Sequence, residues 1–174
     1  MHSQTHTAPA EVAAMLSDGW AALTARVLGA LFLLAVGIIH LHEYQKLYSN
    51  IPTISTLFIL SFVGAVVVSA GLLLPVDRLP RPWGNLAVIG LALAGIGQAV
   101  IQFVFLWISE QRPLFGFQEP GYDPPAIRAA RVTEVATVVL LTAFLILRTV
   151  HRRRKSQVSQ QRPASPTMSS AAHK

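Results

Sequence analysis

Four long apolar runs fill most of this 174-residue chain, at residues 23–41, 54–74, 86–108 and 132–147. A helix of about 20 mainly apolar residues crosses a bilayer core about 30 Å thick. Within lipid, a helix satisfies all of its backbone hydrogen bonds inside one segment. The runs therefore predict an all-α, polytopic membrane protein that folds as an antiparallel four-transmembrane-helix bundle. With flanking residues included, this transmembrane domain covers residues 20–149, with spans at about residues 20–44, 54–74, 85–109 and 125–149.

The composition agrees with a membrane protein and excludes several kinds of site. The chain is 52% hydrophobic and only 13% charged, about half the charged fraction of a soluble domain. It has no cysteine, which excludes disulfides, cysteine-ligated zinc, iron–sulfur clusters and thiol relays. The formal net charge of +6 does not predict nucleic-acid binding, because no basic surface interleaved with aromatic residues is visible.

The segments outside the spans are polar. Residues 1–19 contain no Lys or Arg, so they lack the basic start of a cleaved signal peptide and are expected to form an N-terminal cytoplasmic segment. Residues 150–174 are basic and then rich in Ser, Gln, Ala and Pro, which predicts a disordered cytoplasmic tail. Asp123 before Pro124 and Pro125 is typical of an N-cap followed by a first-turn proline. Span four should therefore begin there.

Basic residues are distributed unequally between the two sides of the predicted bundle, and this sets its orientation. If both termini lie inside, ten of the 14 Lys and Arg residues lie inside and four lie outside. This bias predicts both termini in the cytoplasm of a bacterium, with the protein as a multi-pass component of the plasma membrane. We expect four residues after span four to contact anionic lipid headgroups, at about 1 kcal/mol per basic residue. They are Arg152, Arg153, Arg154 and Lys155.

Polar side chains within the spans are costly in lipid and are therefore the candidates for a site. They gather in the outer halves of spans one, three and four, which predicts a polar pocket in the outer leaflet beneath residues 110–125. Its candidate residues are His40, Glu43, Tyr44, Gln98, Gln102 and Glu134. Such a pocket suits a quinone, a lipid headgroup or a small solute. The alternative is that Gln98 and Gln102, four residues apart on one helix face, only hydrogen-bond to a neighbouring helix.

The sequence His40-Leu-His42-Glu43 raises the further hypothesis of a metal site. His40 and Glu43 share a helix face, whereas His42 points away from His40 unless the helix ends there. The alternative is that these are interfacial side chains that reach water, and that Arg131 pairs with Glu134 one turn away. A two-histidine haem site is disfavoured, because His40 and His42 both lie on span one. The cofactor stays unspecified.

Two stretches resemble known membrane proteins. Residues 37–44 (Gly-Ile-Ile-His-Leu-His-Glu-Tyr) and residues 48–58, which contain Ile-Pro-Thr-Ile, are similar to a group of small uncharacterised actinobacterial proteins with four spans. The overall layout, with an Arg-led first span, resembles DoxX-like four-helix membrane proteins. The second resemblance implies a quinone-linked redox or accessory role, but none of its site residues map onto this chain.

These observations favour a non-catalytic role, because the chain contains no complete catalytic or phosphate-binding motif. We expect an accessory or assembly subunit, or an interaction module, that lies in the bilayer with a membrane protein partner or a second copy of itself. The alternative is a redox, metal or quinone-handling subunit that uses the outer-leaflet pocket. A small-solute transporter is less favoured, because no discontinuous helix pair or inverted repeat is evident.

Overall fold

The structure is a computed structural model that describes the backbone of residues 9–80 and 82–161, and the side chains of residues 19–80 and 82–157. Its four long helices are α1 (Pro9–Glu43), α2 (Pro52–Leu73), α3 (Trp83–Gln111) and α4 (Pro124–Gln161). A π-helical turn, η1 (Tyr44–Tyr48), follows α1, and a 3-10 turn, η2 (Val76–Arg78), follows α2. Within the described residues, all four helices are long and apolar enough to cross a membrane. This confirms the predicted all-α four-helix bundle of a small integral membrane protein.

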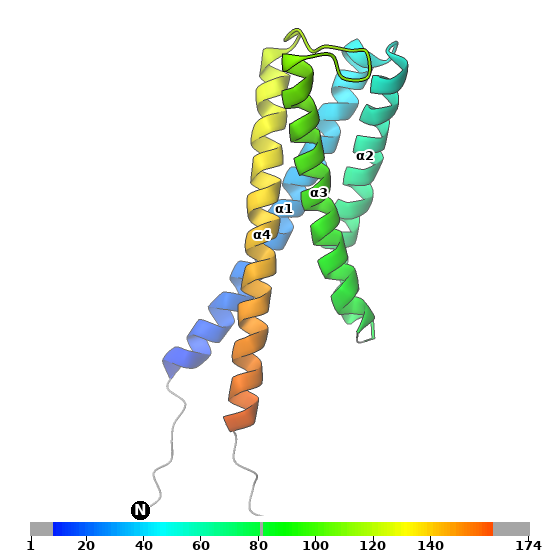
Figure 1. Ribbon diagram of the computed structural model, residues 1–174. Helices are drawn as coiled ribbons and strands as arrows, with labels where there is room; N and C mark the ends of the chain where they lie inside the picture. The colour runs from blue at the N-terminus through cyan, green and yellow to red at the C-terminus, as the bar shows by residue number, and fades with distance from the viewer. Residues whose placement is uncertain (1–8, 81, 162–174) are drawn as a thin grey trace, which may run out of the picture.

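The helices run up and down, and each packs against the next in the order α1, α2, α3, α4, with α4 closing the ring against α1. Figure 1 shows that the start of α1 and the end of α4 lie at the same end of the bundle, which we call the terminal end, and that α1 and α4 extend beyond α2 and α3 there. The opposite end, which we call the loop end, carries residues 112–123; these cross the top of the bundle from α3 toward α2.

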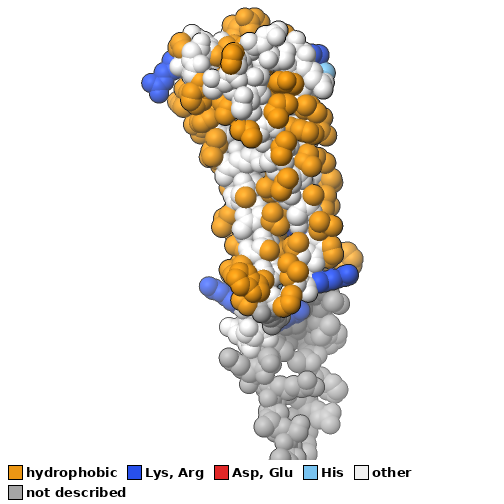
Figure 2. Space-filling view, turned by 90° about the vertical axis from the view of Figure 1, so that its right-hand side faces the viewer, with side chains coloured by type: hydrophobic (Ala, Val, Ile, Leu, Met, Phe, Trp, Pro, Cys, Tyr) orange, Lys and Arg blue, Asp and Glu red, His pale blue; other side chains and the backbone are white. Residues whose placement is uncertain are grey.

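The surface between the two ends is apolar. Figure 2 shows one face on which hydrophobic side chains cover the middle of the bundle, while Lys and Arg side chains lie only toward its two ends. Large side chains such as Leu60, Val67 and Leu93 are more than half exposed, which a soluble protein would avoid on this scale. This belt is the surface expected of helices whose solvent is lipid.

Small residues let the helices approach closely. A Cβ atom at Gly37 of α1 would lie 2.7 Å from the Cβ of Ala65 on α2 and 3.5 Å from the backbone of Phe62. Because lipid is as apolar as the helix surfaces, such close van der Waals contact is a main source of helix association in membranes. Between the helices, Leu33, Leu72 and Leu141 are fully buried and fill the axis of the bundle.

The first candidate span begins at Gly19, as predicted, although the helix α1 itself begins at Pro9. One predicted boundary differs from the structure. α4 continues to Gln161, so the prediction that residues 150–161 are disordered was wrong. No Gly or Pro interrupts residues 126–161, and a helix already formed in the bundle extends at little cost through residues that tolerate helix. The predictions for residues 1–8 and 162–174 lie outside the described residues.

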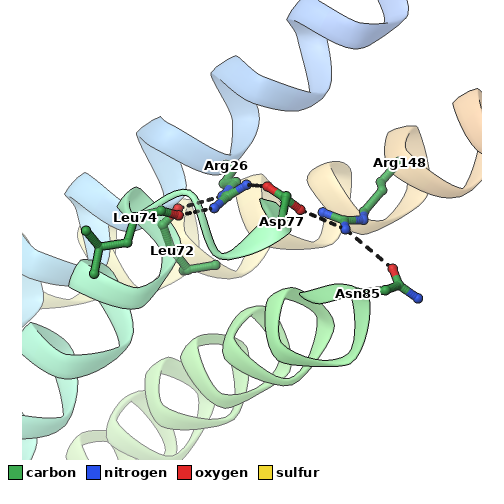
Figure 3. Close-up of polar contacts among 6 residues, drawn as sticks. All are labelled: Arg26, Leu72, Leu74, Asp77, Asn85 and Arg148. Atoms are coloured by element: carbon green, nitrogen blue, oxygen red, sulfur yellow. Dashed lines mark hydrogen bonds and ion pairs between the residues drawn. The ribbon is translucent and has the colours of Figure 1, made fainter. Parts of the chain in front are cut away.

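At the terminal end, a charged cluster joins all four helices, as Figure 3 shows. Arg26 of α1 is 7% exposed and donates hydrogen bonds to the carbonyl oxygens of Leu72 (2.5 Å) and Leu74 (2.8 Å), which lie at and just beyond the end of α2. The last carbonyl groups of a helix have no hydrogen-bond partner within it, and lipid cannot provide one. Arg26 therefore supplies the hydrogen bonds that these carbonyl groups need. Arg26 also donates to Asp77 in η2.

The carboxylate of Asp77 is shared between two arginines. Its second oxygen accepts a hydrogen bond of 2.9 Å from Arg148 of α4, which also lies 3.4 Å from the side-chain oxygen of Asn85 on α3. Burial alone would raise the pKa of Asp77, but hydrogen bonds and positive charge from Arg26 and Arg148 outweigh it and hold the pKa below its usual value. We call Arg26, Asp77 and Arg148 the terminal clasp.

Asp77→Asn should destabilise the bundle, because it leaves two arginines without their shared anion. We expect the free energy of unfolding to fall by about 1–3 kcal/mol, the usual cost of losing hydrogen bonds to a charged group. Thermal unfolding in detergent measures this loss. Since the native pKa of Asp77 is lowered, its contribution is present above pH about 4 and is lost as the pH falls through that lower pKa. The variant should lack this acid-sensitive component.

Arg78→Gln is the matched control, because Arg78 is an exposed neighbour in the same turn. Equal unfolding midpoints for Asp77→Asn and Arg78→Gln would contradict a stabilising role for the terminal clasp.

Candidate functional site

A cavity of about 130 Å³ lies inside the loop end of the bundle, beneath residues 112–123. All four helices, the π-helical turn and the loop contribute side chains, and most of these are apolar or aromatic. The lining residues are Ile39, His40, Glu43, Tyr48, Ile54, Leu57, Phe58, Ser61, Gln102, Phe105, Leu106, Ser109, Leu114, Phe117, Glu119, Ala126, Ile127 and Ala130. We call this space the loop-end cavity.

The last turn of α1 supplies two of its polar side chains. His40 and Glu43 lie three residues apart and therefore share a helix face. The Nδ1 atom of His40 lies 2.9 Å from the carbonyl oxygen of Val36, and its ring packs on Phe58 with centroids 5.0 Å apart. Because a carbonyl only accepts, Nδ1 carries the proton, and Nε2 of the neutral ring is an acceptor. Glu43 is 6% exposed, and its Oε1 atom has no hydrogen-bond partner within the described residues.

The two glutamines of α3 bind the same residue of α2. Gln98 Nε2 donates to the backbone oxygen of Ser61 at 2.8 Å, and Gln102 Nε2 donates to the Ser61 hydroxyl. The hypothesis that these amides join neighbouring helices is thus confirmed. Gln102 also lines the loop-end cavity, and its Oε1 atom is buried without a hydrogen-bond partner in the described part of the chain. One end of this amide holds the helices together, and the other end is an unused acceptor.

A buried tyrosine–glutamate pair holds the loop over the cavity. The π-helical turn Tyr44–Tyr48 ends in Tyr48, which is 4% exposed and donates a hydrogen bond to Glu119. The other oxygen of Glu119 accepts hydrogen bonds from the backbone N–H groups of Gly121 (2.8 Å) and Tyr122 (3.1 Å). The Tyr48 ring also stacks on Phe58 at 4.9 Å. These contacts link η1 and α2 to the loop. We call residues 112–123, which cover the cavity, its roof, and Glu119 is the residue that fixes the roof to Tyr48.

A tight turn shapes the rest of the loop. Leu114 and Phe117 pair through two backbone hydrogen bonds of 2.7 and 3.0 Å. Between them, Phe115 and Gly116 have φ angles of 53° and 79°, which is the left-handed pair that a type I′ turn requires. The turn directs Leu114 and Phe117 into the cavity lining, whereas Phe115 is 55% exposed.

Ion pairs fix the start of α4 at the rim of the loop end. Asp123 caps α4 by accepting a 3.1 Å hydrogen bond from the backbone of Ala126 and lies 3.8 Å from Lys46, which confirms the predicted N-cap. Arg131 pairs with Glu110 at the end of α3. The expectation that Arg131 pairs with Glu134 was therefore wrong: Glu110 at the bundle rim attracts the long Arg131 side chain out of the lipid-facing region.

Glu134 lies one turn below the cavity and does not line it. It is 1% exposed, and neither of its carboxyl oxygens has a hydrogen-bond partner within the described residues. It borders instead a shallow apolar groove between α3 and α4. The other residues of this α3–α4 groove are Ala99, Val100, Phe103, Val135, Val138 and Val139.

The structure thus brings together part of the predicted site. His40, Glu43 and Gln102 line one cavity, Gln98 is joined to it through Ser61, and Tyr44 and Glu134 lie outside the lining. His42 is exposed, as its place on the opposite helix face predicts. No three His, Asp or Glu side chains of the described chain come close enough to hold one metal ion, so the geometry adds no support to the metal hypothesis for His40, His42 and Glu43.

Three polar residues of the cavity lining, Tyr48, Ser61 and Glu119, were not among those predicted from the sequence. Glu119 lies in a loop, and Tyr48 and Ser61 lie outside the polar clusters of spans one, three and four. A usable signal was present for Tyr48, since it follows the polar end of span one by about one turn. Nothing local to Glu119 predicts its burial, which depends on the path of the whole loop.

The chain matches no protein-family model, no curated protein and no solved structure. The resemblances to actinobacterial four-span proteins and to DoxX-like proteins therefore stay predictions, and the function has to be argued from the cavity itself.

The chemistry available in the loop-end cavity is hydrogen-bond acceptance within an aromatic enclosure. Glu43 Oε1 and Gln102 Oε1 are unused acceptors, whereas the Tyr48 hydroxyl and the Gln102 amide group already donate to protein partners. Buried polar atoms normally have partners. Two such acceptors in an apolar, aromatic lining match the composition of small-molecule sites, which combine mostly apolar walls with a few polar groups.

Tyr48→Phe should loosen the roof without unfolding the bundle, because it removes one hydrogen bond to Glu119 and keeps the ring. We expect a loss of about 1–2 kcal/mol in local stability. Hydrogen exchange should show it as roughly 5- to 30-fold faster exchange at Gly121 and Tyr122.

Tyr122→Phe is the control, because the Tyr122 side chain is 66% exposed; it should leave exchange in the loop unchanged. Unaltered exchange in Tyr48→Phe would mean that the tyrosine–glutamate pair does not hold the roof.

Proposed function

We propose that this small integral membrane protein is a non-catalytic binding module, an accessory component that holds the polar head of a small membrane-soluble molecule in the loop-end cavity. The observation that carries the proposal is the combination of a roofed, aromatic-lined cavity with two buried acceptors that the protein itself does not use. Such a cavity provides binding and orientation. It contains no nucleophile and base arranged for covalent chemistry.

The size of the cavity supports a small occupant. Its volume of about 130 Å³ is close to that of an apolar cavity of about 150 Å³ that takes up benzene. A single ring with one polar substituent therefore fits, with the substituent directed at Glu43 or Gln102. Longer apolar tails would have to leave between the helices into the lipid.

A second candidate is a quinone-handling redox subunit. The observation in its favour is that His40, Tyr48 and Gln102 line an aromatic cavity of ring size. This lining suits the reduced form of a quinone, whose hydroxyl groups can donate to the unpartnered acceptors. A visible spectrum or a bound quinone in the purified protein would support this candidate. A transporter is less well supported, because Leu33, Leu72 and Leu141 fill the bundle axis below the cavity.

Filling the cavity should abolish binding. Ala130 lines it and is 6% exposed, so Ala130→Leu places three additional carbon atoms in the space. We expect 4-fluorobenzyl alcohol, measured by ¹⁹F NMR with the protein in nanodiscs, to lose at least about tenfold in affinity, because a side chain and a ligand cannot share one close-packed volume.

The neighbouring Ala129→Leu is the matched control, because Ala129 is exposed on the same turn of α4; it should bind as the unaltered protein does. If both variants bind the alcohol alike, the cavity is not the site at which it binds.

We also propose that the terminal end faces the cytoplasm. Among the described residues, Arg26, Arg78 and Arg148 lie at this end, as do the exposed residues 152–155 on the last turns of α4. The loop end has Lys46, Arg112, Arg128 and Arg131, of which two are paired with acids. The positive-inside bias supports this orientation, and contact of residues 152–155 with anionic lipid follows from it.

Single cysteines test the orientation directly, because the chain contains none. In intact cells, Gln118→Cys in the loop should react with a membrane-impermeant maleimide, and Ser156→Cys in α4 should react only after the cells are opened. The reverse labelling pattern would overturn the orientation and would move the loop-end cavity to the cytoplasmic leaflet.

A further inference from the structure

The charges around the loop-end cavity are unbalanced. Two carboxyl groups line it, those of Glu43 and Glu119, and no Lys or Arg does. Both residues are buried, at 6% and 7% exposure. Buried carboxylates without nearby cations are costly, since charge is normally paired when it leaves water.

The basic residues nearest the cavity are directed at other acids. Lys46 lies 3.8 Å from Asp123, and Arg131 pairs with Glu110. Around Glu43 itself, Lys46 and His42 attract its charge, whereas Asp123 and Glu119 repel it. The loop end therefore offers Glu43 no dedicated cation, and its Oε1 atom has no hydrogen-bond partner within the described residues.

Of the two carboxyl groups, only Glu43 has an oxygen to spare. Glu119 accepts from the Tyr48 hydroxyl through one oxygen and from two backbone N–H groups through the other. It contributes negative charge to the cavity but no free acceptor. Glu43 Oε1 and Gln102 Oε1 are the buried oxygen atoms of the lining that have no partner within the described residues and can receive hydrogen bonds from an occupant.

Aromatic rings surround these acceptors. Tyr48 stacks on Phe58 at 4.9 Å and meets Phe117 edge-on at 5.6 Å, and Phe105 completes the lining from α3. Ring faces attract cations, most strongly where water is excluded. Carboxylate, amide oxygen and aromatic faces together are complementary to an ammonium group that carries an apolar body.

An inorganic cation fits this lining less well. Divalent metals take several oxygen ligands in a defined shell, but the described residues hold no group of three or more acidic or histidine side chains placed for one ion. The aromatic walls would leave most of such a shell empty, whereas they match the apolar part of an organic cation.

We propose that the loop-end cavity selects a small organic cation, a protonated amine with an aromatic or other apolar body, whose N–H groups donate to Glu43 Oε1 and Gln102 Oε1. This inference rests on the proposed function, because both concern the same cavity. It goes beyond that function by specifying that the ligand is positively charged.

The test compares two probes that share one ring and differ in charge. The full chain, in nanodiscs of zwitterionic phosphatidylcholine, is titrated at pH 7 with 4-fluorobenzylammonium and separately with 4-fluorobenzyl alcohol, with ¹⁹F NMR as the readout and empty nanodiscs as the blank. Zwitterionic lipid avoids attraction of the cation to the bilayer itself. We expect the cation to bind at least about tenfold more tightly than the alcohol.

Glu43→Gln keeps the shape of the side chain and removes its charge. It should weaken binding of the cation by about tenfold and leave the affinity for the alcohol within about twofold, so that alcohol binding also reports that the variant is folded. Glu110→Gln is the control, because Glu110 is an acid of the loop end that lies outside the lining. It should leave the preference for the cation intact.

The outcomes separate the two proposals. Equal or tighter binding of the alcohol to the unaltered protein overturns the inference about charge and leaves the proposed function standing. Absence of saturable binding of either probe overturns both. A cation preference that survives in Glu43→Gln also overturns the inference, because Glu43 would then not be the partner of the cation. Displacement of the cation by micromolar Zn²⁺ or Mg²⁺ overturns it as well, because the cavity would then be a metal site.

Discussion

Lipid offers no hydrogen bonds, and this constraint organises every polar contact in the protein. A polar atom between the two ends of the bundle must find a partner within the chain or remain without one. Most find one: Ser69 donates to the backbone of Ala30 at 2.9 Å, Gln98 donates to the backbone of Ser61 at 2.8 Å, and Thr137 donates to the preceding turn of its own helix. The unpartnered atoms are therefore informative, and the structure concentrates them in few places.

The two ends meet this constraint in different ways. At the terminal end, Arg26 and Arg148 share Asp77, and Arg26 also caps the carbonyls at the end of α2. Two arginines share one carboxylate there. At the loop end, the tyrosine–glutamate pair closes a roof over space that is not filled, and acceptors on Glu43 and Gln102 stay unused. The terminal end thus holds the bundle together through paired charges, and the loop end has a cavity whose lining includes acceptors that no described residue uses.

The sequence predicts the large features because they depend on local composition. Helix number, approximate spans, the cap at Asp123 and the amide contacts of Gln98 all follow from the spacing of apolar and polar residues. The place of a site beneath residues 110–125 also follows, since His40, Glu43 and Gln102 lie on inward faces near one end. These are properties of single helices and their direction through the bilayer.

The remaining features depend on contacts between distant segments, which no local pattern encodes. Glu119 is buried because the loop turns at Phe115 and Gly116 and returns over Tyr48. Arg131 reaches Glu110 on another helix, although Glu134 is closer in sequence. The clasp depends on η2, which brings Asp77 back beneath Arg26. The helical extent of residues 150–161 was missed for a different reason, because composition alone does not show that a helix continues out of the membrane.

Intermolecular NOEs would show whether a small molecule occupies the space beneath the loop. With methyl-labelled protein in nanodiscs of deuterated lipid, the ring protons of 4-fluorobenzyl alcohol should show NOEs to the methyl groups of Ile54, Leu106 and Ile127, which line the cavity from three helices. NOEs confined to Val100, Val135 and Val138 of the α3–α4 groove would contradict the account, because they would place the molecule on the lipid-facing surface.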